Sequence, residues 1–431
     1  MKWYLPGAVL PAALIGMMVG ASPAVAADLG GNCCADLEER IAELESTVAR
    51  RGNRKVSLEI SGWVAEQVVY WDDGVESNTY VTGLGTAFAS NFNFHGKAQI
   101  TQDVSAGYVL HIEAITSDVY TTSQDNPNGA GVFSGSPNSL QVLYSYWYLQ
   151  SEKYGRLSVG QLSPADDSAV VALDSSGTLA AAYWVAYDVF GFKVRGNFAP
   201  GESLIWGNAG SCRGYGGGPG DCNGVPLNVV RYDTPTLHGF SASASWGEDD
   251  NWALAGRYIN THGDLTLKGV VTYSETRDSR QGAPLGGGLQ YTQASIYLQH
   301  NPSGWFAQGA WGYLDQTSNP QDNPATNTWY VKSGVRLGLT SLGATIPFGE
   351  RLKAYDGALV VNDGGTPDIP ADDVSRVIKG SETTFWGFGV VQEIDAAAMS
   401  IWLRYREHDV DLPNIETKGL STVVFGGFIN F

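Results

Sequence analysis

The sequence predicts an all-β protein, a transmembrane antiparallel β-barrel of about 16 strands preceded by a short helix. Three observations favour this fold: apolar and polar residues alternate from residue 55 onward, short and long connections alternate, and the last strand ends on an aromatic residue. Apolar residues make up 43% of the chain, yet no later window approaches the roughly 18 apolar residues of a membrane helix. Apolar surface spread over many short segments crosses a bilayer only as a closed barrel.

Residues 1–26 have the features of a secretory signal peptide. Lys2 supplies the positive charge, an apolar run extends from Leu5 to Val19, and small residues at Ala24-Val25-Ala26 form the cleavage pattern. An uncleaved membrane anchor is disfavoured because prolines and glycines interrupt a run that is short for a bilayer. We therefore expect an exported protein whose mature chain starts at Ala27.

Residues 27–54 are predicted to form a periplasmic coiled-coil segment and a basic hinge. The apolar residues of its heptad seam are Cys34, Leu37, Ile41, Leu44 and Val48. A helix this short is marginal alone, so the seam implies a partner. The alternatives are a clasp between three copies, a tether to the cell wall or another periplasmic partner, and packing on the chain's own barrel. Cys33 and Cys34 are candidates for a crosslink between chains at the clasp.

Residues 55–431 are predicted to form one barrel domain with strands of about ten residues. Phe92 and Phe94, for example, oppose Asn93 and His95 along one strand, so one face is apolar and the other polar. A half-buried sheet of a soluble protein has the same alternation. One strand alone therefore does not exclude a soluble β-sandwich.

The connections favour the membrane barrel over the sandwich. Short turns such as 151–155 and 395–398 alternate with long loops such as 163–182 and 355–382, as in barrels with short periplasmic turns and long external loops. Two segments, 182–190 and 192–200, are the least secure strands. If they belong to an infolded loop, the count is 16, which we favour; otherwise it is 18.

The last strand, Leu420–Phe431, is predicted to close the barrel. It should pair with the first strand, near Val56–Tyr70, so that no strand edge is left unpaired in lipid. Its apolar residues Phe425, Ile429 and Phe431 are candidates for a barrel assembly signal. Tyr and Trp also gather at strand ends, where aromatic girdles meet the membrane interfaces.

Several motifs resemble one known family, the alphaproteobacterial porins. They are the acidic heptad beginning at Cys34, Gly52-Asn-Arg-Lys-Val-Ser-Leu, Ser61-Gly62-Trp63, Tyr70-Trp71-Asp72-Asp73-Gly74, Tyr232-Asp-Thr-Pro, His238-Gly-Phe-Ser and Ser245-Trp-Gly-Glu-Asp-Asp. The resemblance covers nearly the whole chain. It implies a homotrimeric general-diffusion channel of about 16 strands in a Gram-negative outer membrane, in contact with lipids and lipopolysaccharide. It also implies that the third external loop folds into the lumen.

Such a channel sorts solutes at a constriction, where carboxylates on the infolded loop face basic residues on the wall. Asp166, Asp167 and Asp174 follow the fifth strand and are predicted for the acidic side; the alternative is three solvated carboxylates in a surface loop. A charge facing lipid costs roughly 2 to 4 kcal/mol near the midplane, so basic residues on polar strand faces should face the lumen. These candidates are Lys97, Arg195, Arg231, Arg257, Lys268, Lys332, Arg336, Arg404 and Arg406.

Other classes of function are disfavoured. A formal net charge of −18 argues against nucleic acid as a partner. The sequence has no G-x-S-x-G or H-E-x-x-H motif, and we expect no cofactor, no metal site and no enzymatic activity. A lipase or protease assembled around His95 and His111, and a Ca²⁺ site among the acids of 362–373, are the minor alternatives. Cys212 and Cys222 form a predicted disulfide, because exported proteins meet an oxidising compartment.

The expected function is passive diffusion of small hydrophilic solutes and ions through a water-filled channel. A substrate-specific channel is the alternative if Tyr183, Trp184 and Tyr187 form an aromatic stacking track. A barrel that only tethers the envelope is a second alternative.

Overall fold

The computed structural model describes most of the chain after residue 54. The described ranges are 55–85, 88–117, 119–127, 129, 139–183, 187–210, 226–247, 250–277, 288–316, 324–362 and 374–431. The predicted signal peptide, the heptad seam and the Cys212–Cys222 disulfide lie outside these ranges and stay predictions. None of the helices within them is long and apolar enough to cross a membrane.

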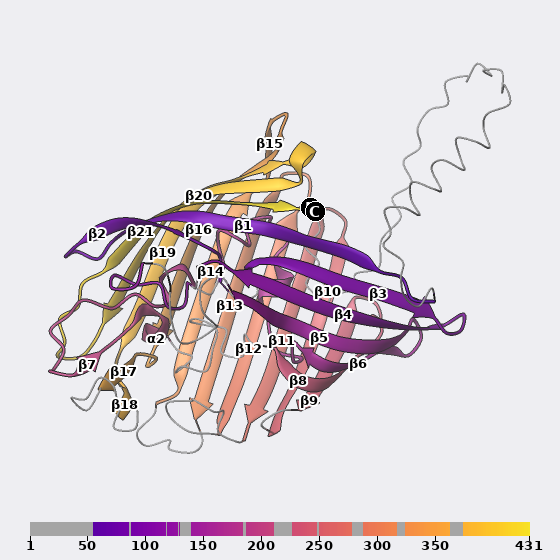
Figure 1. Ribbon diagram of the computed structural model, residues 1–431, viewed down its shortest axis with the longest axis horizontal. Coiled ribbons are helices and arrows are strands. Elements are labelled where there is room, and N and C mark those ends of the chain that lie inside the picture. Colours follow the sequence, from indigo (N-terminus) through magenta and orange to yellow (C-terminus); the bar gives the residue numbers. More distant parts are fainter. Residues whose placement is uncertain are drawn as a thin grey trace.

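Sixteen antiparallel strands form a closed barrel, as predicted (Figure 1). They are β1 (Glu59–Asp72), β3 (Ser90–Gln99), β4 (Val104–Ile115), β5 (Ser139–Ser151), β6 (Gly155–Leu162), β8 (Leu227–Asp233), β9 (Phe240–Gly247), β10 (Asn251–His262), β11 (Leu265–Thr276), β12 (Leu289–His300), β13 (Trp305–Gln316), β14 (Thr326–Val335), β16 (Gly343–Tyr355), β19 (Glu382–Ile394), β20 (Met399–Asp411) and β21 (Leu420–Asn430). Two short strands extend the sheet. β2 (Ser77–Thr82) pairs with one half of β1, while β3 pairs with the other half, and β15 (Leu337–Thr340) continues the line of β14 along β16.

The barrel closes between its first and last strands. β1 and β21 pair in continuous register from Trp63 opposite Asn430 to Asp72 opposite Ser421. The backbones of Gly62 and Phe431 then exchange two hydrogen bonds of 3.1 Å. The predicted closing strand is therefore confirmed, and the barrel has no open edge along this seam.

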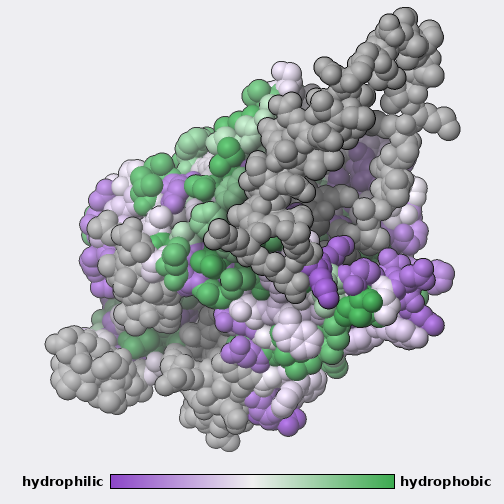
Figure 2. Space-filling view, turned by 45° about the vertical axis from the view of Figure 1, so that its right-hand side comes forward, coloured by the Kyte–Doolittle hydropathy of each residue, from purple (hydrophilic) through white to green (hydrophobic). Residues whose placement is uncertain are grey.

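Side chains alternate between the two faces of each strand with the two-residue period of a β-strand. On β1, Val64, Val68 and Tyr70 are exposed on the outer face, whereas Ala65 and Trp71 are buried on the inner face. The same outward apolar surface recurs around the barrel, for example at Leu254, Val271, Ile296 and Val331. Figure 2 shows hydrophobic side chains gathered over the strands of one face, with hydrophilic side chains toward the margins. This outer surface matches a lipid environment.

The connections at one end of the barrel are short, as in residues 100–103, 152–154, 263–264 and 395–398. Most connections at the other end are long, and the segment 248–250 between β9 and β10 is the exception. A small second sheet lies at the long-loop end, where β17 (Leu359–Asn362) pairs with both β18 (Val374–Val377) and β7 (Glu202–Ser203) (Figure 1).

The connection between β6 and β8, residues 163–226, is called the infolded loop below. It contains two short 3-10 helices, η1 (Val171–Leu173) and η2 (Tyr187–Val189), the strand β7 and the one-turn helix α2 (Trp206–Ala209). Segments 182–190 and 192–200 belong to this loop, so the alternative of 18 barrel strands is wrong. Their apolar residues Phe190, Phe192 and Val194 imitate strand alternation because they are buried within the barrel.

Candidate functional site

The infolded loop follows one inner wall of the barrel, from β8 round to β20. Side chains of successive wall strands donate hydrogen bonds to its backbone carbonyls. These are Arg231 to Ser163 and Pro164 (3.1 and 3.2 Å), Arg257 to Ala165 (2.8 Å), Gln293 to Asp166 (2.7 Å), Gln308 to Val170 (3.1 Å), Lys332 to Ala182 (2.8 Å) and Arg404 to Ala181 (3.0 Å). The loop carbonyls need partners because they are buried away from bulk water. The wall supplies these partners strand by strand.

Ion pairs between the wall and two aspartates of the loop, Asp174 and Asp188, also hold the loop in place. Lys332 pairs with Asp174, and both side chains are almost fully buried. Arg404 and Arg406 both pair with Asp188 of the loop, and none of these three side chains is more than 2% exposed. Buried charges of this kind are tolerated only when they are paired. These ion pairs therefore hold the loop in one position against the wall.

Two wall carboxylates complete this network. Glu350 of β16 accepts a 2.7 Å bond from Arg406, and Glu393 of β19 accepts two bonds from Arg336, at 2.8 and 2.9 Å. Sequence reasoning missed both residues, together with Asp188. Glu350 and Glu393 lie on the polar faces of their strands, so the rule that selected the basic residues would also have found them. Asp188 lay in a segment whose apolar residues suggested a strand.

The three predicted acidic residues are buried. Asp174 is paired with Lys332, whereas Asp166 and Asp167 lie where the loop turns along the wall, with 0% and 5% of their surface exposed. Burial raises the pKa of the Asp167 carboxyl to about 7, and the charge of Asp166 adds to this shift. Hydrogen bonds from Ser163 and Ser168 and the nearby charge of Arg231 act in the opposite direction. Burial therefore favours the protonated form of Asp167.

The predicted basic residues fall into three groups. Arg231, Arg257, Lys268, Lys332, Arg336, Arg404 and Arg406 all contact the infolded loop, Lys268 through the hydroxyl of Ser175. Lys97 is exposed near the short turn after β3, away from the loop. Arg195 belongs to the loop itself and pairs with Asp73 (2.7 Å) and Glu76 beyond the end of β1.

The opposite inner wall, formed by β1, β3, β4 and β5, makes fewer hydrogen bonds with the loop, although the ring of Trp71 packs on Phe192 with centroids 5.3 Å apart. The Tyr144 hydroxyl lies 3.2 Å from that of Ser163, and the ring of Phe88 stacks on Tyr183 with centroids 5.5 Å apart. Cross-strand register places Asn91, Asn93, His111 and Tyr144 next to one another on the inner face of this wall. These polar residues stand across the lumen from the wall that holds the loop.

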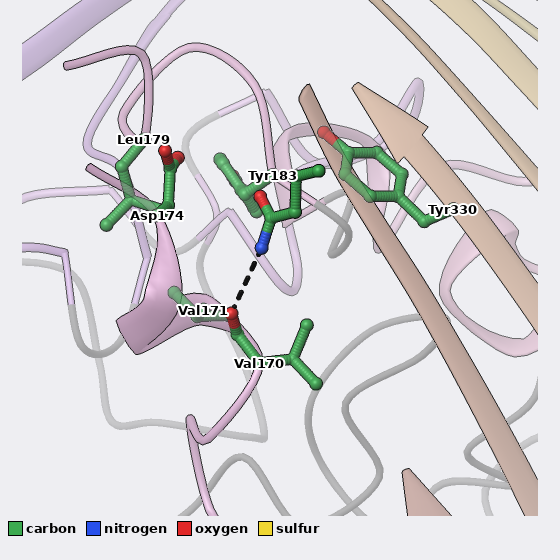
Figure 3. A pocket seen from close by; sticks show the side chains of 7 residues that line it. Val170, Val171, Asp174, Leu179, Tyr183 and Tyr330 are labelled. Carbon is green, nitrogen blue, oxygen red and sulfur yellow. Dashed lines mark hydrogen bonds between the residues drawn. The ribbon is translucent and has the colours of Figure 1, made fainter. Parts of the chain in front are cut away.

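The loop packs tightly against its own wall. A cavity of about 10 Å³ lies between Val170, Val171, Leu179 and Tyr183 of the loop and Gln308 and Tyr330 of the wall strands. Figure 3 shows Tyr330 on its strand across this cavity from Asp174 and Leu179, with the Gln308 hydrogen bond to the loop backbone. A space of this size holds no more than one water molecule. No solute passes behind the loop at this point.

Of the proposed aromatic track, Tyr183 is buried against Phe88, while Trp184 and the side chain of Tyr187 lie outside the described residues. Within the described ranges, no group of three or more His, Cys, Asp or Glu side chains is arranged to hold a metal ion. The geometry is that of a barrel lumen divided by a fixed loop.

Comparisons with known proteins agree with this architecture. A family model described as Gram-negative porin matches residues 12–417. No curated protein sequence matches significantly. The anion-selective porin from Comamonas acidovorans is a similar solved structure, with 15% identity, a TM-score of 0.53, and coverage of 87% of this chain and 100% of the other.

Two further solved structures are similar. OmpF of Salmonella typhi in complex with daunomycin has 11% identity and a TM-score of 0.51, with coverage of 88% of this chain and 98% of the other. The trimer form of in-vitro folded OmpT, an outer membrane protein of Vibrio cholerae, has 9% identity and a TM-score of 0.50, with coverage of 87% and 99%. At such identities the likeness concerns the fold.

Proposed function

The chain belongs to the Gram-negative porin family, and from this premise we propose how it works as a passive channel for small hydrophilic solutes and ions in the outer membrane. The observation that supports the mechanism is the row of hydrogen bonds and buried ion pairs that holds the infolded loop along the wall from β8 to β20. The loop narrows the lumen, and the polar wall of β1, β3, β4 and β5 remains as the other side of the path. Solutes then diffuse through water, at rates set by the size and charge of this gap.

The carboxylates and basic residues have two roles in this proposal. Asp174, Asp188, Arg404 and Arg406 hold the loop through buried ion pairs. Asp166, Asp167 and Arg257 lie near the turn of the loop and contribute the field that solutes meet there. No step requires a reacting group, so we propose a channel without enzymatic activity.

The family and the sequence motifs of this chain support proposals about its subfamily, its oligomeric state and its membrane environment. The opening motifs at residues 34–74 support an alphaproteobacterial member of the family. We propose a homotrimer surrounded by lipids and lipopolysaccharide with its long loops facing outward, and the OmpT structure described as a trimer supports this assembly. The N-terminal heptad segment is proposed to clasp the trimer, or to contact the cell wall.

Single-channel recording tests the proposed function. The purified full-length protein, inserted into a planar bilayer in KCl, should produce stepwise increases of conductance, and a salt gradient should give a reproducible zero-current potential. A folded protein, identified by its heat-dependent shift on gels, that inserts and gives no steps would contradict the channel.

A further inference from the structure

The inner wall carries a group of polar atoms without hydrogen-bond partners. They are Oδ1 of Asn91, Oδ1 of Asn93, Nδ1 of His95, and both ring nitrogens of His111. Within the described part of the chain, none of these atoms has a partner, and Asn91 and His111 are each only 3% exposed. Leaving such an atom unpaired costs roughly 1 to 3 kcal/mol. Several together indicate a site whose partners come from outside the chain.

These residues form one continuous surface, called the amide–histidine patch below. Asn93 lies directly opposite His111 across the β3–β4 pair, and Asn91 lies opposite Glu113 in the next inward position. Oε2 of Glu113 accepts a 2.9 Å bond from Gln141 on β5. The unpaired atoms therefore share one area of the lumen wall, on two adjacent strands.

Aromatic rings border the patch. The rings of Trp63 and Tyr144 lie on either side of His111, with centroids 6.3 and 5.5 Å away, and both meet it edge-on at 77°. Two further inward tyrosines, Tyr146 and Tyr148, continue along β5 toward the short-turn end, where Arg156 stacks on Tyr148 at 3.8 Å. Trp63, Asn93 and His95 are half-buried, whereas the unpaired atoms themselves lie just beneath the surface, so a bound solute reaches them by displacing the side chains that cover them.

The chemistry of the patch selects the solute. The two amide oxygens only accept, so the solute must donate, while a neutral imidazole offers one donor and one acceptor. A hydroxyl group can serve all of these atoms because it both donates and accepts. Phosphate and carboxylate solutes are disfavoured, since they would bring further acceptors to amide oxygens. Neighbouring aromatic rings can pack against the C–H groups on the face of a sugar ring.

We propose that the amide–histidine patch is a binding subsite for an uncharged polyhydroxylated solute, a sugar or polyol, on its way through the channel. The subsite rests on the proposed channel function and adds a substrate class to it. Weak binding at the wall raises the local concentration of the solute in the gap beside the infolded loop. The channel thereby favours such solutes over others of the same size.

Current block by raffinose tests this subsite. Raffinose added to the full-length protein in a planar bilayer should interrupt the KCl current. For each variant, the binding constant is calculated from the fraction of that variant's open-channel current that raffinose blocks. Poly(ethylene glycol) dimethyl ether of matched hydrodynamic radius provides the comparison, because its ether oxygens accept and it has no hydroxyl group to donate. The blocking constant for raffinose should exceed that of the polymer.

Two substitutions remove polar atoms of the patch. Asn93→Leu replaces a half-buried amide by a side chain of similar size, and His111→Phe keeps an aromatic ring without its polar nitrogens. Each should weaken raffinose binding about five-fold or more, as expected for one lost hydrogen bond of about 1 kcal/mol. Gln299→Leu on the inner face of β12 makes a matched amide replacement elsewhere in the lumen and should leave the raffinose constant unchanged.

The outcomes separate the two proposals. Normal KCl steps without raffinose block in the unsubstituted protein, or an equal block in Asn93→Leu, overturn the subsite and leave the channel intact. Absence of KCl steps in the unsubstituted protein overturns the channel itself. If His111→Phe fails to assemble, the half-exposed Asn93→Leu alone decides the matter.

Discussion

At the scale of single residues, many polar side chains of the inner wall bind the infolded loop. One set of basic residues, including Arg231, Arg257 and Lys332, is used to hold the backbone of the infolded loop. The sequence predicted that these residues face inward, because lipid excludes charges. It did not predict their partners, since hydrogen bonds to loop carbonyls depend on the path of a segment with no regular pattern. Their contribution to solute sorting stays a prediction.

Asp167 should make the channel sensitive to pH. Its folded-state pKa is raised from 3.8 to about 7, first by burial and then by the charge of Asp166. The charged and titratable groups that face it are Asp166, Arg231 and Tyr144. The folded state favours the protonated carboxyl of Asp167. The contribution of Asp167 to folding stability is therefore fully present below pH 3.8 and is lost as the pH rises through about 7.

The zero-current potential under a KCl gradient should therefore shift toward cation preference between about pH 6 and pH 8. The reason is that Asp167 becomes negatively charged as it loses its proton, and this charge attracts cations into the lumen. Asp167→Asn should remove this shift, while Asp264→Asn, in the turn between β10 and β11, should retain it. A shift of unchanged size in Asp167→Asn would show that another group titrates.

At the scale of elements, local alternation predicted the strands because each has one face toward lipid and one toward the lumen. The same alternation misled at 182–200, where apolar residues are buried between the loop and the barrel wall. The position of this loop depends on ion pairs between distant residues such as Asp188, Arg404 and Arg406. Pairs separated by more than 200 positions leave no local signal in one sequence.

Breaking the Asp188 ion pairs should free the loop. Asp188→Asn leaves Arg404 and Arg406 short of a buried counter-charge, a loss worth about 3 to 5 kcal/mol for a buried pair. We expect a lower midpoint of denaturant unfolding, faster proteolysis within the loop, and larger current fluctuations.

The exposed pair Lys353–Glu382 provides the control for this change. Glu382→Gln should lower stability far less than Asp188→Asn, because solvent-exposed pairs are screened by water. Equal effects of the two substitutions on unfolding and on current noise would contradict the anchoring role of Asp188.

At the scale of the whole molecule, closure of the barrel joins residues from the two ends of the domain. The prediction that the last strand pairs with the first followed from its apolar alternation and from the need to leave no edge in lipid. Phe431 adds two backbone bonds to Gly62 and a ring contact with Phe92, with centroids 6.0 Å apart. Phe425 and Ile429 lie on the outer face of the same strand.

Deleting Phe431 should lower the fraction of chains that assemble, since the seam loses its last backbone pair. Barrels that do form should keep the unsubstituted conductance, because the lumen is unaltered. Phe388→Ala removes an outward aromatic of similar exposure on β19, 55% against 56%, and should assemble normally. Heat-modifiability on gels measures assembly. An equal loss in both variants would exclude a special role for the chain terminus.

The wall contacts of the infolded loop also imply an order of events in time. The loop spans residues 163–226, and the wall side chains that donate hydrogen bonds to its backbone, from Arg231 to Arg404, all come later in the chain. The loop therefore lacks these anchors until the second half of the barrel has been threaded and paired, although its contacts with Trp71, Asp73 and Tyr144 involve earlier segments. The loop should thus reach its final position, and the pore its size limit, only after the last strands have paired.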